Sequence, residues 1–221
     1  MSLNAKCLPR PSRRLPKGRW LKIDAVMISC PERARMRCQT LEDLSKTDWA
    51  GHPLRVVVDP GCGNDYRKRQ THCALLALEK GLEGQGDFIL YLEDDLAFNR
   101  HIHHNLQHWG LLRTGRVTLA SLYNPGVKEL ACDLGNRARL VPPRSVFGSQ
   151  AFLIARETAR RLVDGWNKIQ GMQDIRISRL AGRLGSPVFY HAPSLVQHIG
   201  HASVWGGRFH QAVDYDPLWR A

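Results

Sequence analysis

The sequence predicts an α/β fold, a single domain whose mostly parallel central sheet is flanked by helices. The apolar run at 23–28, rich in β-branched residues, predicts a buried first strand. Two further apolar runs, at 54–58 and 88–92, follow it and are separated by stretches of helical composition. Strand, helix, strand, helix, strand is the order typical of parallel sheets. The 221 residues are enough for one substantial core.

The remaining elements follow from the same patterns. We expect a helix at 32–44 and another at 66–80, which ends at Gly81. The second half predicts strands at 116–122, 149–154 and 187–190, and helices at 156–166 and 174–184.

Composition and charge suggest how the chain is organised. We expect a basic flexible arm at 1–20, one folded domain at 21–210 and a C-terminal tail at 211–221. The net charge of +12 predicts attraction to polyanions, which the arm would bind. No apolar run approaches the roughly 20 residues of a transmembrane helix, so we expect a cytoplasmic protein. The six scattered cysteines lack a C-x-x-C pair, which argues against a disulfide framework or a cysteine-rich zinc site.

Three consecutive carboxylates, Glu93, Asp94 and Asp95, follow the run at 88–92. Like charges held this close repel each other unless a cation neutralises them. Carboxylate oxygens suit Mg²⁺ or Mn²⁺, which also bind substrate phosphates. The alternative is a solvated acidic turn in which Asp94 or Asp95 caps a helix.

The segment Phe88-Ile-Leu-Tyr-Leu-Glu-Asp-Asp-Leu resembles the strand and acidic DXD motif of GT-A fold glycosyltransferases, which are Rossmann-like. The resemblance implies a nucleotide diphosphate sugar as donor, a UDP-sugar in our expectation, and Mn²⁺ or Mg²⁺ as cofactor. It also implies that Asp95 is the metal ligand and that Glu93 or Asp94 contacts the ribose.

A second segment, Ala192-Pro-Ser-Leu-Val-Gln-His-Ile-Gly-His-Ala-Ser, is similar to a late Pro-Ser-Leu-x-Gln-His-x-Gly segment of some N-acetylglucosaminyltransferases. In GT-A enzymes a histidine from this region often completes the metal shell, and neutral imidazole is a competent ligand. The resemblance therefore implies His198 as a metal ligand, with His201 as the second choice. The alternative for His201 is a hydrogen bond to loop backbone.

The resemblance also gives roles to other polar residues. Asp174, at an expected helix start, would be the general base of an inverting enzyme, although aspartate is equally familiar there as a helix cap. Asp59 would meet the base or ribose, while Ser29 and Arg33 would meet the nucleotide and its phosphates. A further group would line the donor-sugar pocket: Gly148, Ser149 and Gln150. For each of the six residues named after Asp174, a turn or surface role is the alternative.

Two other features have simpler interpretations. His101, His103 and His104 follow the acidic triplet, and a solvated helix face accounts for them better than a metal site does. The segment from Trp205 to His210 contains two glycines that would permit a closing flap over the donor.

The predicted function is a metal-dependent transfer of a sugar to an acceptor hydroxyl. The positive charge suits an anionic acceptor such as a cell-envelope or lipid-linked glycan or hydroxymethylated DNA. The alternative is a non-enzymatic nucleic-acid-binding protein that uses the basic arm, although no helix-turn-helix, finger or aromatic RNA-binding signature supports it.

Overall fold

A computed structural model describes residues 19–61, 65–126, 138–143, 146, 148–185, 187–200 and 210–221. Its centre is a seven-stranded sheet in the order β2-β1-β3-β7-β5-β8-β6. The strands of this sheet are β1 (Ile23–Ser29), β2 (Leu54–Val58), β3 (Phe88–Leu92), β5 (Leu119–Ser121), β6 (Ala138–Val141), β7 (Ala151–Ala155) and β8 (Val188–His191). The predicted α/β fold is confirmed.

The sheet is mixed rather than mostly parallel. The pairs β1–β2, β1–β3 and β5–β8 are parallel, whereas β3–β7, β5–β7 and β6–β8 are antiparallel. The first residue of β7, Ala151, pairs with the last residue of β3, Leu92. Because β7 starts where β3 ends, it must run in the opposite direction, and the residues just before it lie beside the acidic triplet.

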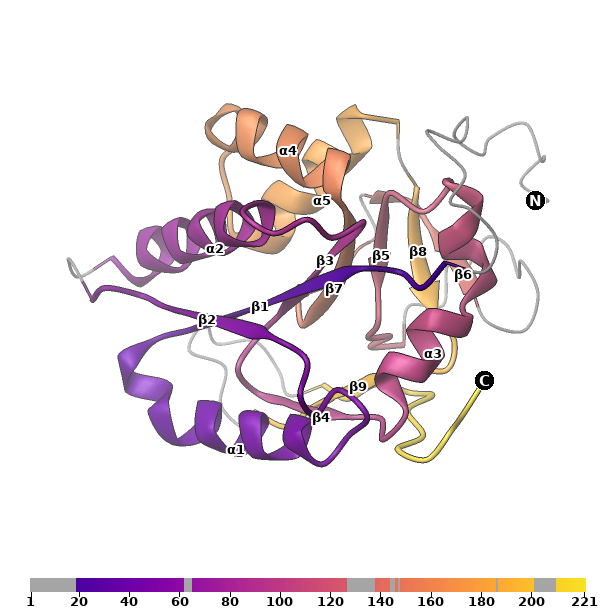
Figure 1. Ribbon diagram of the computed structural model, residues 1–221. Coiled ribbons are helices and arrows are strands. Elements are labelled where there is room, and N and C mark those ends of the chain that lie inside the picture. Colours follow the sequence, from indigo (N-terminus) through magenta and orange to yellow (C-terminus); the bar gives the residue numbers. More distant parts are fainter. Residues whose placement is uncertain are drawn as a thin grey trace.

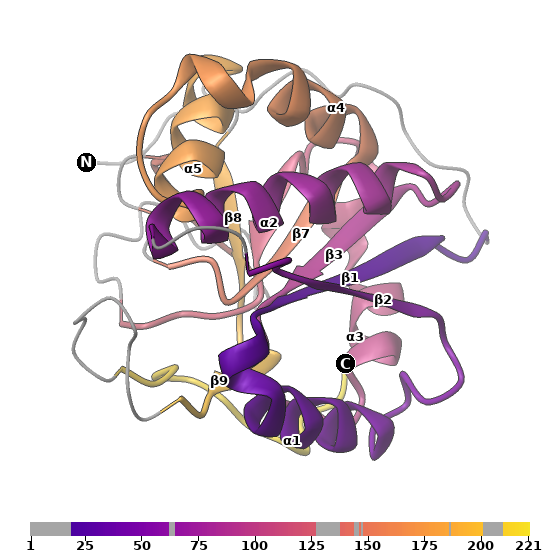
Figure 2. The same ribbon diagram turned by 90° about the vertical axis from the view of Figure 1, so that its left-hand side faces the viewer.

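Helices cover both faces of the sheet (Figure 1, Figure 2). In both views α2 (Tyr66–Leu82), α4 (Arg156–Gly165) and α5 (Gln173–Arg183) lie over one face, and α1 (Ala34–Ser45) and α3 (Ile102–His108) lie over the other. Short 3₁₀ turns precede or follow them: η2 (Pro31–Arg33), η3 (Gly110–Thr114) and η5 (Trp166–Lys168).

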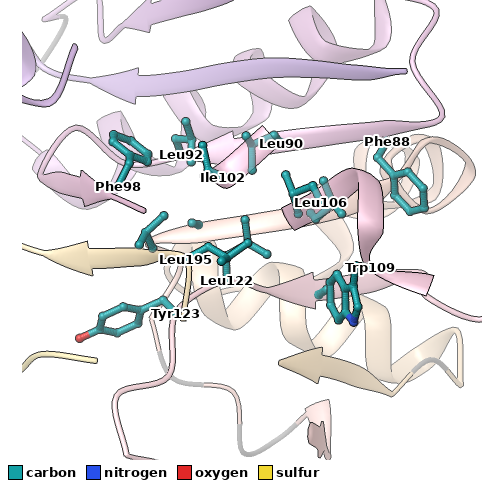
Figure 3. Packing of buried hydrophobic residues seen from close by; sticks show 14 of the residues in the cluster. Phe88, Leu90, Leu92, Phe98, Ile102, Leu106, Trp109, Leu122, Tyr123 and Leu195 are labelled. Carbon is teal, nitrogen blue, oxygen red and sulfur yellow. The ribbon is translucent and has the colours of Figure 1, made fainter. Parts of the chain in front are cut away.

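The central strand β3 is buried on both faces. Successive side chains of a strand point to opposite sides, so Leu90 and Leu92 pack in one hydrophobic cluster and Ile89 and Tyr91 in the other. Figure 3 shows Ile102 and Leu106 of α3 beside Leu90 and Leu92 in the first cluster. The acidic triplet is therefore attached to a fully buried strand of the sheet.

A two-stranded ladder outside the main sheet has no counterpart among the predicted elements. It pairs β4 (Leu96–Phe98) with β9 (Val196–His198) in antiparallel register, and Leu96 lies opposite His198. Each strand has three residues, too few for an alternating pattern to be visible in the sequence. The ladder brings the late histidine segment to the acidic triplet.

Residues 211–221, which we expected to form a tail, contact the fold. The Asn99 side-chain amide donates to the carbonyls of Asp216 and Trp219, and the backbone N–H of Ala221 donates to Asn105. Most of the predicted basic arm lies outside the described residues. Within the described part of the chain, no helix has the length and apolar character that crossing a bilayer requires.

Candidate functional site

Backbone hydrogen bonds on three sides fix the acidic triplet at the carboxyl end of β3. The Glu93 N–H donates to the carbonyl of Gln150 at 2.9 Å, before β7. The Thr40 hydroxyl of α1 donates to the carbonyl of Asp94 at 2.8 Å, and the Ile199 N–H, after β9, donates to the carbonyl of Asp95 at 2.9 Å. The three carboxylates are therefore held by separate elements and cannot spread apart freely.

Asp94 is held by residues that follow β1. Because β1 and β3 are parallel neighbours, the residues after both strands meet at one edge of the sheet. The Ser29 hydroxyl donates to Asp94 Oδ2 at 2.5 Å, and Arg33 Nε lies 3.1 Å from Asp94 Oδ1. Burial raises the pKa of Asp94, although Arg33 and the Ser29 hydroxyl oppose that shift.

Asp95 faces two cationic or potentially cationic groups. Arg33 Nη2 and His198 Nε2 both contact Asp95 Oδ2, the second at 3.1 Å. Burial opposes ionisation, but His198 and Arg33 outweigh it and hold the pKa of Asp95 below its usual value. In turn, burial would lower the pKa of His198, yet the Asp95 carboxylate raises it. Asp95 and His198 thus form one electrostatic unit.

The side chain of Glu93 accepts hydrogen bonds from two uncharged side chains. Its Oε1 accepts from the Ser149 hydroxyl at 2.5 Å and from the Gln173 side-chain amide at 2.8 Å. The Tyr91 hydroxyl donates to Gln173 Oε1 at 3.0 Å, which orients that amide. Burial, reinforced by the negative charge of Asp95, raises the pKa of Glu93 to about 7. Burial and the nearby carboxylate of Asp95 therefore both oppose ionisation of Glu93.

A pocket opens beside the triplet, between the end of β1 and the first turns of α2. Ser29, Arg33, Asp59, Tyr66 and Asp94 are among the residues that line it. Asp59 is buried and accepts a hydrogen bond from Arg69 Nε at 2.5 Å. Arg69 also reaches Glu32 at 3.1 Å. The pocket therefore has carboxylates on two walls and a fixed guanidinium between β2 and α2.

The described residues fit a divalent cation between Asp95 and His198. Asp95 Oδ1 is buried and has no hydrogen-bond partner within the described part of the chain. A Cβ atom at Gly200 would lie 2.6 Å from Asp95 Oδ2 and 3.0 Å from His198 Nε2, so only glycine leaves this space open. A carboxylate oxygen and an imidazole nitrogen are ligands that Mn²⁺ accepts. No group of three or more His, Cys, Asp or Glu side chains suited to a metal occurs among the described residues.

Several predicted site residues meet in this region. Ser29, Arg33 and Ser149 contact the triplet directly, and Gln150 contacts it through its backbone. Gly148 has φ +70°, and a Cβ there would lie 2.2 Å from Gln150 Oε1. Asp174 is in the first turn of α5, next to Gln173.

Other predicted positions lie apart or outside the described chain. His201 and residues 205–209 of the predicted flap are outside the described residues, whereas His210 stacks on His198 at 5.0 Å between ring centroids. His103 is not on a freely solvated face, because its ring stacks on His52 at 4.2 Å and meets Trp49 edge-on at 5.5 Å.

Comparison with solved structures shows which fold these elements form. The chain is similar to GalNAc-T7, crystallised with UDP, GalNAc and Mn²⁺, with a TM-score of 0.60 and 13% identity over 86% of this chain and 45% of that one. The chain has a GT-A fold. It therefore spans less than half the length of that GT-A protein. No protein-family model and no curated protein matches it.

Two further GT-A structures are similar at lower scores. A Drosophila β1,4-galactosyltransferase 7 mutant, in complex with manganese, UDP-Gal and xylobiose, has a TM-score of 0.49 at 12% identity over 81% of this chain and 71% of that one. Apo GlyE of Streptococcus pneumoniae has a TM-score of 0.45 at 13% identity over 75% and 44%.

Three residues that contact the acidic residues of this site were not singled out from the sequence. Thr40, Arg69 and Gln173 each bond to an acidic residue of the site or to its backbone. Gln173 adjoins Asp174 at a helix start, a signal that could have been used. Thr40 and Arg69 lie inside ordinary helical segments, and nothing local distinguishes them.

Proposed function

We propose that the chain is a metal-dependent glycosyltransferase that moves a sugar from a UDP-sugar to an acceptor hydroxyl. The observation that carries the proposal is the buried pair of Asp95 and His198, 3.1 Å apart, beside two further carboxylates at the end of β3. The GT-A fold supports it. The UDP, GalNAc and Mn²⁺ named for the GalNAc-T7 structure support the choice of donor and metal.

Asp95 and His198 would hold Mn²⁺ or Mg²⁺, and His201 stays a second candidate. The cation would supply positive charge to a diphosphate leaving group. Arg33 now neutralises Asp94 and Asp95 and lines the pocket, so its guanidinium is within reach of a diphosphate bound there. Planar guanidinium groups bind phosphate oxygens in pairs.

The other residues of the site are proposed to contact either the nucleoside or the donor sugar. Asp59 and Ser29, together with Glu93 or Asp94, are proposed for the nucleoside, because they line the pocket at the ends of β1, β2 and β3. Gly148, Ser149 and Gln150 are proposed for the donor sugar, because β7 brings them to Glu93.

Asp174 is proposed as the general base of an inverting reaction. Its neighbour Gln173 bonds to Glu93, so the first turn of α5 lies at the edge of the site. A carboxylate there would accept the proton of the acceptor hydroxyl as the sugar is attacked. Its use as a helix cap is the competing role, but Met172 is the N-cap residue of α5, and Asp174 Oδ1 accepts the adjacent N–H of Ile175 at 2.8 Å.

Thermal unfolding with and without UDP and MnCl₂ tests the proposal. A ligand that binds only the folded state adds about 2.7 kcal/mol of stability at a hundred times its Kd. We expect a clear rise in Tm for the wild type and almost none for Asp95→Asn. Asp164→Asn, an exposed carboxylate on α4, is the matched control and should behave as wild type. Absence of a shift with UDP, GDP, CDP or TDP and either metal would refute the proposal.

A further inference from the structure

A second hollow lies on the opposite side of α2 from the pocket beside the acidic triplet. One wall is the first half of α2, from Arg67 to Leu75, and the other is the segment from Trp166 to Arg176 that includes η5 and the start of α5. The two helices lie side by side and are in contact (Figure 2). We call this space the α2–α5 hollow.

The rim of the α2–α5 hollow is positively charged. Arg67, Lys68 and Arg176 line it together with His72, and no aspartate or glutamate is among its lining residues in the part of the chain described. Arg67, Lys68 and His72 are exposed. Lys68 has one acidic neighbour, Asp65, at 3.7 Å, and Asp65 also caps α2. Three permanent cations around one concave surface create a positive potential that favours an anion.

Arg176 is already held in position. Its Nε donates to the carbonyl of Gly171 and its Nη1 to the carbonyl of Trp166, both at 2.9 Å. Its guanidinium also lies over the ring of Trp166, 5.6 Å from the ring centroid. A cation fixed by two backbone carbonyls loses little conformational freedom when it binds a ligand.

The inner surface of the hollow is partly apolar. Leu75, Trp166, Met172 and Ile175 contribute to its lining, and Trp166 is 2% exposed. An apolar surface beneath a cationic rim suits a ligand with a carbon-rich face and an anionic substituent. A saccharide that carries a phosphoryl group has both.

The first turn of α5 lies between the hollow and the acidic triplet. Met172 and Ile175 line the hollow, while Gln173 between them reaches across to Glu93 at 2.8 Å. Asp174 lies in the same turn of α5. Gln173 and Asp174 do not line the hollow, so the first turn of α5 separates a ligand bound there from the acidic triplet.

We infer that the α2–α5 hollow binds the phosphoryl group of a phosphorylated saccharide. This inference depends only on the charge and geometry of the hollow and not on the proposed glycosyltransferase function.

Binding of glucose 6-phosphate to the full chain, without metal or nucleotide, tests the site. Titrations followed by ³¹P NMR should show saturable binding of glucose 6-phosphate by the wild type. Binding by Arg67→Ala and by Lys68→Ala should be at least about tenfold weaker. Glucose without a phosphoryl group should not displace the bound glucose 6-phosphate. Charge-assisted hydrogen bonds of 1.5 kcal/mol or more correspond to such a factor. Arg179→Ala is the matched control, because Arg179 is exposed on α5 but does not line the hollow.

Each outcome bears on the inference. Equal weakening by Arg67→Ala and Arg179→Ala would mean general attraction to a basic protein and would overturn it, as would undetectable binding or equal competition by glucose. The thermal shift with UDP and MnCl₂, measured on the same variants, reports on the proposed function separately. Phosphate-dependent binding without that shift would support the hollow as a sugar-phosphate site and count only against the proposed function.

Discussion

His198 Nε2 lies 3.1 Å from Asp95 Oδ2, although the two residues are 103 positions apart in the sequence. The β4–β9 ladder makes this contact, because Leu96, which follows Asp95, pairs with His198. The contact converts two weak sequence signals into one arrangement that places a carboxylate oxygen and an imidazole nitrogen side by side. This arrangement is the basis of the predictions that follow.

Replacing Arg33 should destabilise the metal-free protein. Arg33 contacts both Asp94 and Asp95, whose side chains are 4% and 5% exposed. Arg33→Ala removes the guanidinium from two buried carboxylates, of which Asp95 keeps its contact with His198. We expect a loss of about 2 kcal/mol in the free energy of unfolding measured in urea. Mn²⁺ together with UDP should restore much of this stability.

Arg35→Ala is the control for that experiment. Arg35 is exposed on α1, and its replacement removes the same charge from the protein. We expect its free energy of unfolding to stay close to that of the wild type. Similar losses for both variants would show that Arg33 has no special role beside the carboxylates.

Gly200→Ala should weaken metal binding more than it weakens the fold. The new Cβ would lie 2.6 Å from Asp95 Oδ2 and 3.0 Å from His198 Nε2, so both side chains must move. We expect on the order of tenfold weaker Mn²⁺ binding in the presence of UDP. Gly110→Ala, where the added Cβ meets no atom within 4 Å, provides the comparison. Unchanged Mn²⁺ affinity in Gly200→Ala would argue that the cation lies elsewhere.

The protein should become less stable as the pH decreases, because His103 binds a proton more readily in the unfolded chain than in the fold. Burial, followed by the charge of His52, lowers the pKa of His103 below 6.5, whereas Asp48 opposes this shift and His104 adds to it. The unfolded chain therefore binds more protons as the pH drops below 6.5, so the free energy of unfolding decreases from there to the lowered pKa. His103→Phe should flatten this decrease in denaturation curves between pH 7 and 5, and an identical slope would contradict the assignment.

Much of the fold could be predicted from the sequence because its strands are apolar and locally recognisable. The runs at 23–28, 54–58 and 88–92 became β1, β2 and β3 almost residue for residue. Because β1 and β3 are parallel neighbours, the residues that follow the two strands meet, and Ser29 bonds to Asp94.

What could not be predicted depends on pairing over long distances. The antiparallel direction of β7 follows from where a chain segment returns to the sheet, which no local pattern encodes. The three-residue strands β4 and β9 are likewise formed by each other. Gln173 and Arg69 acquire their roles only when α5 and α2 pack beside the acidic residues.

Calorimetric titration of Mn²⁺ into the protein saturated with UDP tests the central claim most directly. We expect one site per chain in the wild type, at least about tenfold weaker binding in His198→Ala and no measurable binding in Asp95→Asn. Mn²⁺ affinity that is the same in all three proteins would show that the acidic triplet and the late histidine do not hold the cation.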